Sequence, residues 1–175
     1  MRTHASKLAG PQKPAVFSAR GKGVKWSSPM ESREADIDDF EEILKLYRQL
    51  QPGDPILDDG RDRAVFREIL ANDMLKLFVL ENEGNIVSSI YLNIIPNITR
   101  SASPYAVIEN VVTVEHERGK GFGKALMLNV LSYAWSVGCY KAMLLTGSSK
   151  ETTHAYYRSC GFAGNVKTGY IAKPT

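Results

Sequence analysis

Hydrophobic and polar residues alternate with a helical period in the first strongly patterned part of the chain. Apolar side chains recur three or four positions apart over residues 37–50, which predicts an amphipathic helix. Asp36 is a suitable N-cap, and Pro52-Gly53 would end the helix. A short strand is predicted just before this helix. The apolar positions are Ile37, Phe40, Ile43, Leu44, Tyr47 and Leu50.

Apolar, β-branched runs further along the chain are typical of strands. Residues 75–95 contain two such runs joined by Glu-Gly-Asn, which predicts a hairpin. The valine-rich segment 105–114 and "YKAMLL" (140–145) predict two more strands. "GFAGNVKTGYIAK" (161–173) has the pattern of a final hairpin.

Three more helices are predicted among these strands. They cover residues 61–74, 122–137 and 150–159. The second of them is apolar on most faces, which suits a helix lying on a sheet. Helices interspersed with strands and hairpins predict an α/β (α+β) single domain with a mixed sheet.

The composition narrows the class of protein. The chain has 175 residues, of which 43% are apolar and 23% charged, as in an ordinary soluble protein. No apolar run is long enough to predict a membrane span. Two cysteines are too few for a disulfide framework, which favours reduced thiols and a cytoplasmic location. The histidines and cysteines lack the spacing of metal ligands, so we predict no metal.

Charge is distributed unevenly along the chain. Residues 1–30 contain six Lys and Arg and no acid, whereas the remainder holds sixteen Lys and Arg against nineteen Asp and Glu. We therefore expect 1–29 to be a basic N-terminal arm or extension. It would be disordered, a targeting peptide, or upstream of a natural start at Met30. Residues 30–175 form the domain, and their mild acidity gives no support to nucleic-acid binding.

The segment "VEHERGKGFGKAL" (114–126) combines three glycines with three cations just before an apolar helix. Glycine lets backbone N–H groups approach a ligand, and a helix start attracts anions, phosphate above all. A solvated glycine-rich turn is the alternative. Neither the P-loop nor the dinucleotide spacing fits, because Arg118 and Lys124 stand where glycine is needed.

The same segment resembles a known family. Arg118-Gly119-Lys120-Gly121-Phe122-Gly123 matches the Arg/Gln-x-x-Gly-x-Gly/Ala signature of the GNAT superfamily of acyl-CoA-dependent N-acetyltransferases. "AYYRSCGF" (155–162) is similar to a second family motif, and the resemblance runs from about residue 30 to the end. It implies a mostly antiparallel central sheet flanked by helices, and acetyl-CoA as co-substrate.

The resemblance also implies where the cofactor binds. The loop and helix start would hold the pyrophosphate of coenzyme A, and the end of the preceding strand would pair with the pantetheine amides. The implied cofactor-binding residues are Val112, Thr113, Val114, Arg118, Gly119, Lys120, Gly121, Phe122, Gly123 and Lys124.

Two residues are candidates for acid–base chemistry. Tyr157 matches the family tyrosine that protonates the coenzyme A sulfur, although it could merely pack beside the cofactor. Tyr156 is adjacent, and neighbouring helix positions diverge by about 100°, so only one of the two can face the sulfur. Glu109 lies within a valine-rich strand, and the resemblance implies that it receives the amine proton. A solvated strand face is the alternative for Glu109.

The predicted reaction is acetyl transfer to a small-molecule primary amine by direct attack in a ternary complex. A non-catalytic acyl-CoA-binding or sensing module, and acetylation of a protein or peptide amine, stay open. Asp54, Asp58 and Asp59 would suit a cationic acceptor, unless they are only solvated. No nucleic-acid or membrane partner is expected, and a homodimer is possible.

Overall fold

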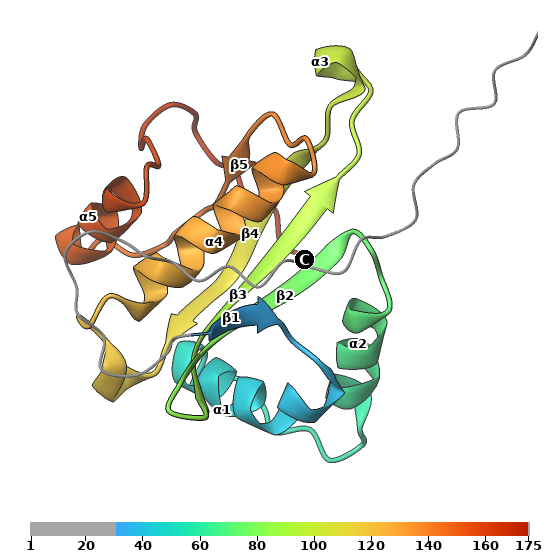
Figure 1. The fold of residues 1–175 in the computed structure, drawn as a ribbon, viewed down its shortest axis with the longest axis vertical. Helices are drawn as coiled ribbons and strands as arrows, with labels where there is room; N and C mark the ends of the chain where they lie inside the picture. The colour runs from blue at the N-terminus through green and yellow to red at the C-terminus, as the bar shows by residue number, and fades with distance from the viewer. Residues whose placement is uncertain (1–30, 175) are drawn as a thin grey trace, which may run out of the picture.

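The computed structural model describes residues 31–174, so the predicted basic arm lies outside the described residues (Figure 1). The strands are β1 (Glu31–Glu34), β2 (Leu75–Asn82), β3 (Asn85–Ile95), β4 (Tyr105–Thr113) and β5 (Ala142–Met143). The helices are η1 (Ile37–Asp39), α1 (Phe40–Leu50), α2 (Arg61–Leu70), α3 (Thr99–Ala102), η2 (Glu115–Glu117), α4 (Phe122–Ser136) and α5 (Glu151–Ser159).

The five strands form one mixed sheet in the order β1-β2-β3-β4-β5. The first three pairings are antiparallel and β4–β5 is parallel. Helix α4 crosses one face of the sheet, while α1 and α2 lie on the other (Figure 1). The predicted fold class is therefore confirmed, as is the hairpin formed by β2 and β3.

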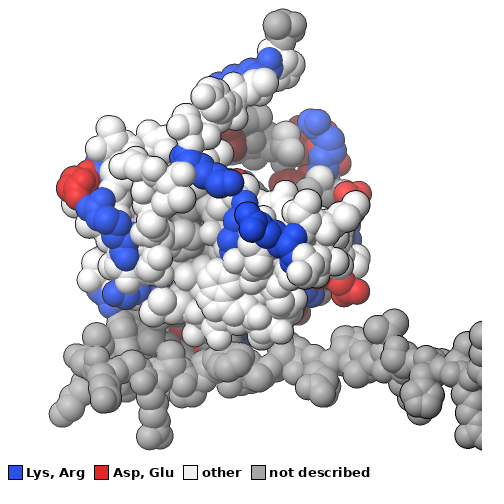
Figure 2. Space-filling view, turned by 90° about the horizontal axis from the view of Figure 1, so that it is seen from above, with Lys and Arg blue, Asp and Glu red and all other residues white. Residues whose placement is uncertain are grey.

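The end of the molecule that carries α3 presents little charge. Figure 2 views this end, where uncharged surface surrounds a few Lys and Arg side chains. Arg100 and Ser101 have φ near 57°, so α3 is an irregular turn and not a true helix. Beside it lies an apolar hollow of about 570 Å³, lined by Met74, Ile98 and Tyr133 among others.

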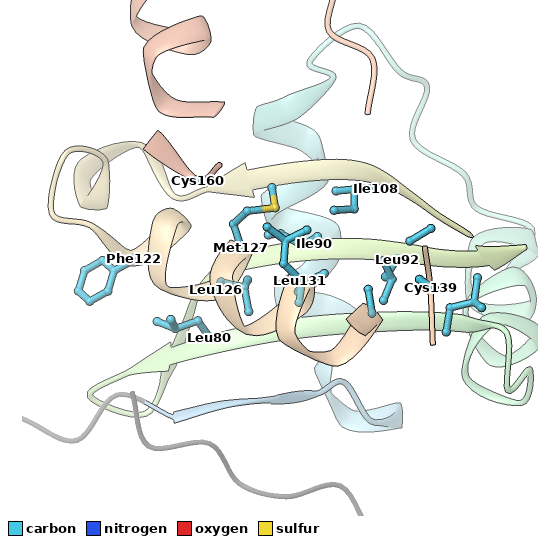
Figure 3. Close-up of a cluster of buried hydrophobic side chains, with 14 of the residues drawn as sticks. Leu80, Ile90, Leu92, Ile108, Phe122, Leu126, Met127, Leu131, Cys139 and Cys160 are labelled. Carbon is cyan, nitrogen blue, oxygen red and sulfur yellow. The ribbon is translucent and has the colours of Figure 1, made fainter. Parts of the chain in front are cut away.

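Two hydrophobic layers hold the helices on the sheet. Leu126, Met127 and Val130 of α4 are fully buried against Ile90 and other residues of the central strands (Figure 3). Burying a side chain of this size contributes about 1.5–3 kcal/mol, which explains why α4 is apolar on most faces. On the opposite face, α1 packs mainly on β3 and β4. Phe40 and Ile43 of the predicted stripe are buried there, as is Leu46, which the stripe did not include, whereas Ile37 is exposed.

Polar contacts fasten β1 to the start of α1. Asp36 is the N-cap predicted from sequence, although it opens the 3-10 turn η1 ahead of α1. Asp39 completes a capping box by accepting from the Asp36 N–H at 2.7 Å. Arg33 binds both carboxylate oxygens of Asp39, at 2.6 and 2.8 Å, and also Glu81 of β2.

The pairing between β3, β4 and β5 is irregular where the candidate site lies. Register shifts between Ser89 and Tyr91, and Asn110 opposite them has a left-handed φ of 50°. Strand β5 pairs with β4 only at Ala106 and Val107. In the described part of the chain, the outer edge of β4 therefore has no partner strand beyond Val107. The strand predicted over 140–145 is thus shorter than expected.

The predicted hairpin over 161–173 is wrong. Residues 160–174, all of them described, contain no strand. Gly161 and Asn165 have left-handed φ values of 94° and 61°, which interrupt an extended conformation. Val166 and Tyr170 are 70% and 91% exposed, so the apolar alternation has no surface to bury against. Alternation alone stabilises a hairpin only where such a surface exists.

Candidate active site

The glycine-rich loop joins the end of β4 to the start of α4. Gly119 and Gly121 have φ values of 79° and 94°, a conformation that side chains with a Cβ rarely adopt. No backbone carbonyl within residues 31–174 accepts from the N–H groups of five residues at this turn, which are Gly119, Lys120, Gly121, Gly123 and Lys124. Unpaired N–H groups at the positive end of a helix offer a site for an anion.

The three loop cations have different surroundings. The Arg118 Nε donates to the carbonyl of Thr113 at 3.0 Å, so this side chain fastens the loop to β4. Lys120 pairs with Glu117 at 3.0 Å. Lys124 is exposed and forms no ion pair with the residues the structure describes. Of the three side chains, Lys124 is therefore the best placed to meet an anionic ligand.

Gly123 is required for space, since its φ is ordinary. A Cβ at this position would lie 2.8 Å from Thr113 Oγ1 and 3.4 Å from the Tyr156 hydroxyl. The first distance is shorter than a carbon–oxygen contact tolerates. The three glycines thus serve two purposes, with Gly119 and Gly121 turning the loop and Gly123 allowing close packing.

The predicted strand residues Val112, Thr113 and Val114 are largely occupied by contacts within the protein. The Val112 carbonyl accepts from Ser88 Oγ at 2.8 Å. The Val114 N–H donates to Val87 at 2.9 Å, and its carbonyl accepts from Glu117. The backbone left open to a ligand lies earlier, along the outer edge of β4 after Val107.

The structure brings Tyr157 and Glu109 together from α5 and β4. Burial raises the pKa of Tyr157, and the nearby Cys160 and Glu109 raise it further. A negative charge raises the pKa of a phenol only at short range, so the carboxylate of Glu109 lies close to Tyr157. Tyr157 is half-buried with its ring edge-on to Phe162, while Glu109 is exposed. A protonated phenol and a solvated carboxylate are a suitable acid and base.

Tyr156 points in a different direction from Tyr157. Its hydroxyl donates to the carbonyl of Gly123 at 3.0 Å, in the first turn of α4. The two neighbours therefore diverge as a helix requires, and Tyr156 has a hydroxyl already engaged in a protein contact. Among the described residues, the Tyr157 hydroxyl makes no hydrogen bond of this kind, and the charge of Glu109 contributes, after burial and Cys160, to raising its pKa.

A polar cluster on the α1 side of the sheet was not predicted from sequence. Burial raises the pKa of Tyr47, and proximity to the Ser89 and Asn110 side chains offsets part of the rise. Ser89 is fully buried, and no group in the described residues meets its hydroxyl with hydrogen-bond geometry. The apolar pattern predicts Tyr47 only as part of the helical stripe. The serine pair Ser88-Ser89 inside the apolar β3 run is the sequence feature that indicates a buried polar cluster.

The predicted acidic acceptor loop gives less support than expected. Asp54, Asp58 and Asp59 are all exposed, and Asp59 pairs with Arg61 at 2.5 Å. A polar hollow of about 490 Å³ lies elsewhere, between α1 and η2, and its lining does not include Tyr157 or Glu109. Among residues 31–174, no helix could cross a bilayer, and no cluster of His, Cys, Asp or Glu could hold a metal ion.

The family described as the acetyltransferase (GNAT) family matches residues 38–162, which is most of the chain and spans the site from α1 to α5. The chain belongs to the GNAT family. It is an acetyl-CoA-dependent N-acetyltransferase, and the expectation of an enzyme with acetyl-CoA as co-substrate is confirmed.

Related proteins agree with this assignment. A glucosamine 6-phosphate N-acetyltransferase from Trypanosoma brucei brucei is 32% identical over 79% of this GNAT enzyme and 92% of its own length. A putative acetyltransferase from Agrobacterium tumefaciens is 43% identical, with a TM-score of 0.78 over 82% of this chain and 99% of its own. The glucosamine-6-phosphate N-acetyltransferase from Arabidopsis thaliana is 25% identical in sequence. Its structure matches with a TM-score of 0.71 over 84% of this chain and 99% of the Arabidopsis chain.

Proposed function

We propose that this enzyme transfers an acetyl group from acetyl-CoA to the primary amine of a small molecule by direct attack in a ternary complex. The observation that carries the proposal is the glycine-rich loop, whose N–H groups lack backbone acceptors within residues 31–174, beside the open outer edge of β4. Tyr157 and Glu109 supply the acid and base close to this edge. An acid and a base that lie together next to an anion-binding loop suit acyl transfer from an anionic cofactor.

The loop would hold the cofactor through its backbone. The N–H groups of Gly119, Lys120, Gly121, Gly123 and Lys124 meet no backbone acceptor within residues 31–174 and would donate to the pyrophosphate. The Lys124 ammonium would add attraction for its negative charge. The outer edge of β4 beyond Val107 would pair with the pantetheine amides as a neighbouring strand does.

The proposed chemistry needs one proton removed and one supplied. Acetyl-CoA supplies the thioester carbonyl that the amine attacks. Glu109 takes the amine proton, directly or through a water molecule, and Tyr157 donates its phenolic proton to the departing sulfur. A phenol with the usual pKa of about 10 is protonated at neutral pH, and the raised pKa of Tyr157 keeps it so.

The first acceptor to test is an amino-sugar phosphate. The 32%-identical relative from Trypanosoma brucei brucei is described as a glucosamine 6-phosphate N-acetyltransferase. Asn110, from the cluster with Tyr47 and Ser89, directly follows Glu109 and is exposed, so its amide would supply hydrogen bonds to acceptor hydroxyls. Acetylation of a protein amine is the competing outcome of the test.

The test is initial-rate kinetics with acetyl-CoA, followed by thiol release. Glucosamine 6-phosphate, glucosamine and a lysine-containing peptide serve as acceptors, with N-acetylglucosamine 6-phosphate as the control that lacks a free amine. We expect release with a small amine and double-reciprocal lines that intersect, as a ternary complex requires. Parallel lines would exclude direct attack, and release with the peptide alone would exclude a small-molecule acceptor.

A further inference from the structure

A set of hydroxyl groups connects three elements around the start of α4. Ser88 Oγ donates to the Val112 carbonyl at 2.8 Å and lies 3.0 Å from Thr113 Oγ1. Thr113 Oγ1 in turn fills the space beside Gly123, at 2.8 Å from where a Cβ would lie. The end of β4 and the first turn of α4 are thus held in direct contact.

Tyr156 adds α5 to this arrangement. Its hydroxyl donates to the Gly123 carbonyl at 3.0 Å and borders the same space at 3.4 Å. Because Gly123 lies inside the first turn of α4, its carbonyl also accepts the usual helical bond, so the contact with Tyr156 is an additional one. A phenylalanine would fill the same volume without burying a hydroxyl. The tyrosine therefore indicates that the bond itself matters.

We propose that Tyr156 is a positioning residue, whose hydroxyl fixes α5 to the first turn of α4 and so sets the placement of Tyr157 relative to the cofactor loop. The inference rests on the proposed function for the role of Tyr157 as acid. Tyr157 follows Tyr156 directly on α5, and the two ring centroids are 5.1 Å apart, so a displacement of α5 at Tyr156 would also displace Tyr157. Gly123 lies in the first turn of α4, directly after the loop that would bind pyrophosphate, so the same bond also restrains the proposed cofactor site.

The packing around Gly123 predicts that this position requires glycine, although the family signature also accepts alanine there. Thr113 and Tyr156 occupy the space here. Gly123→Ala should weaken acetyl-CoA binding by about tenfold, and adding Thr113→Ala should restore most of the loss. A double variant no better than Gly123→Ala alone would overturn the packing argument.

The direct test compares Tyr156→Phe, Tyr157→Phe and the double variant with the wild type. Removing one neutral hydrogen bond that restrains the site should weaken acetyl-CoA binding about fivefold in Tyr156→Phe, measured by calorimetry. It should also lower kcat about fivefold in the wild type but not in the Tyr157→Phe background, because it acts through Tyr157. Tyr170→Phe, at a 91%-exposed position, is the matched control.

The outcomes separate this inference from the proposed function. Wild-type affinity for acetyl-CoA in Tyr156→Phe would overturn the inference, as would kcat losses that simply add in the double variant. If Tyr157→Phe has the kcat of the wild type, the acid role under the proposed function fails, and the affinity of Tyr156→Phe still decides whether the hydroxyl restrains the loop. A lowered melting temperature with unchanged affinity and kcat would show a structural role only and also overturn it.

Discussion

Glu109 and Tyr157 lie in contrasting environments, one exposed on β4 and the other half-buried on α5. A base assists only while the amine still carries a proton. We therefore expect Glu109→Gln to lower kcat/KM by about tenfold or more where the acceptor amine is largely protonated, and to recover as the pH rises. The measurement is a pH–rate profile of kcat/KM for both proteins with one acceptor. Parallel profiles would remove Glu109 from the mechanism.

Tyr157→Phe removes a hydroxyl and almost no volume. If the phenol protonates the leaving sulfur, kcat should fall about a hundredfold while the affinity for acetyl-CoA changes little. Calorimetry for binding and steady-state rates for kcat make the comparison. A fall in kcat would support the role of Tyr157 as the acid. An unchanged kcat would leave Tyr157 as a packing residue beside Phe162.

Some residues of the candidate site could be predicted from the sequence, and others could not. The loop glycines and Tyr157 occur in short motifs, because their spacing within one loop or one helix turn determines their geometry. The nearness of Tyr47 to Ser89 and Asn110 depends on how α1 lies across the sheet and on the irregular register of β4. Contacts of that kind join distant segments, and no local period predicts them.

Arg33 and Asp39 hold β1 and α1 together. Burial alone would raise the pKa of Asp39, but hydrogen bonds from Arg33 and from the Asp36 N–H lower it overall. A carboxylate with a lowered pKa contributes stability above its unfolded pKa of about 4, and that stability is lost as the pH falls toward the folded value.

Asp39→Asn removes this charge and weakens the capping box. We expect it to lower the free energy of unfolding at neutral pH by about 2 kcal/mol, because a largely buried ion pair loses one partner. Urea denaturation at pH 7 and at about pH 3 is the measurement, and the difference between variant and wild type should shrink at the lower pH. Asp38→Asn, on the exposed side of the same turn, is the control. An equal difference at both pH values would contradict the assignment.

The helices and strands could be predicted where the period of the apolar pattern matches a surface that buries it. The stripe of α1, the apolar face of α4 and the β2–β3 runs all pack in the two hydrophobic layers. The segment 161–173 has an equally good strand pattern, yet Val166, Tyr170 and Ile171 are exposed. A local pattern specifies a tendency, whereas burial against the rest of the molecule decides whether an element forms.

The proposed cofactor site would combine β4, the loop, α4 and α5, so binding there should stabilise the folded molecule. Acetyl-CoA that binds only the native state adds RT ln(1 + [L]/Kd), about 2.7 kcal/mol at a hundredfold excess over Kd. A domain of this size should then melt several degrees higher. Differential scanning fluorimetry with and without millimolar acetyl-CoA measures the shift.

Variants show whether the shift comes from the loop. Gly121→Asp places a negative charge where the pyrophosphate would lie and should abolish the shift, although its φ of 94° will also lower the starting melting temperature. Each variant is therefore compared with itself, with and without ligand. Lys124→Glu reverses one charge without backbone strain and should reduce the shift. Gly53→Asp, in open space after α1, is the matched control and should keep it in full. A wild-type shift that survives in Gly121→Asp would place the pyrophosphate elsewhere.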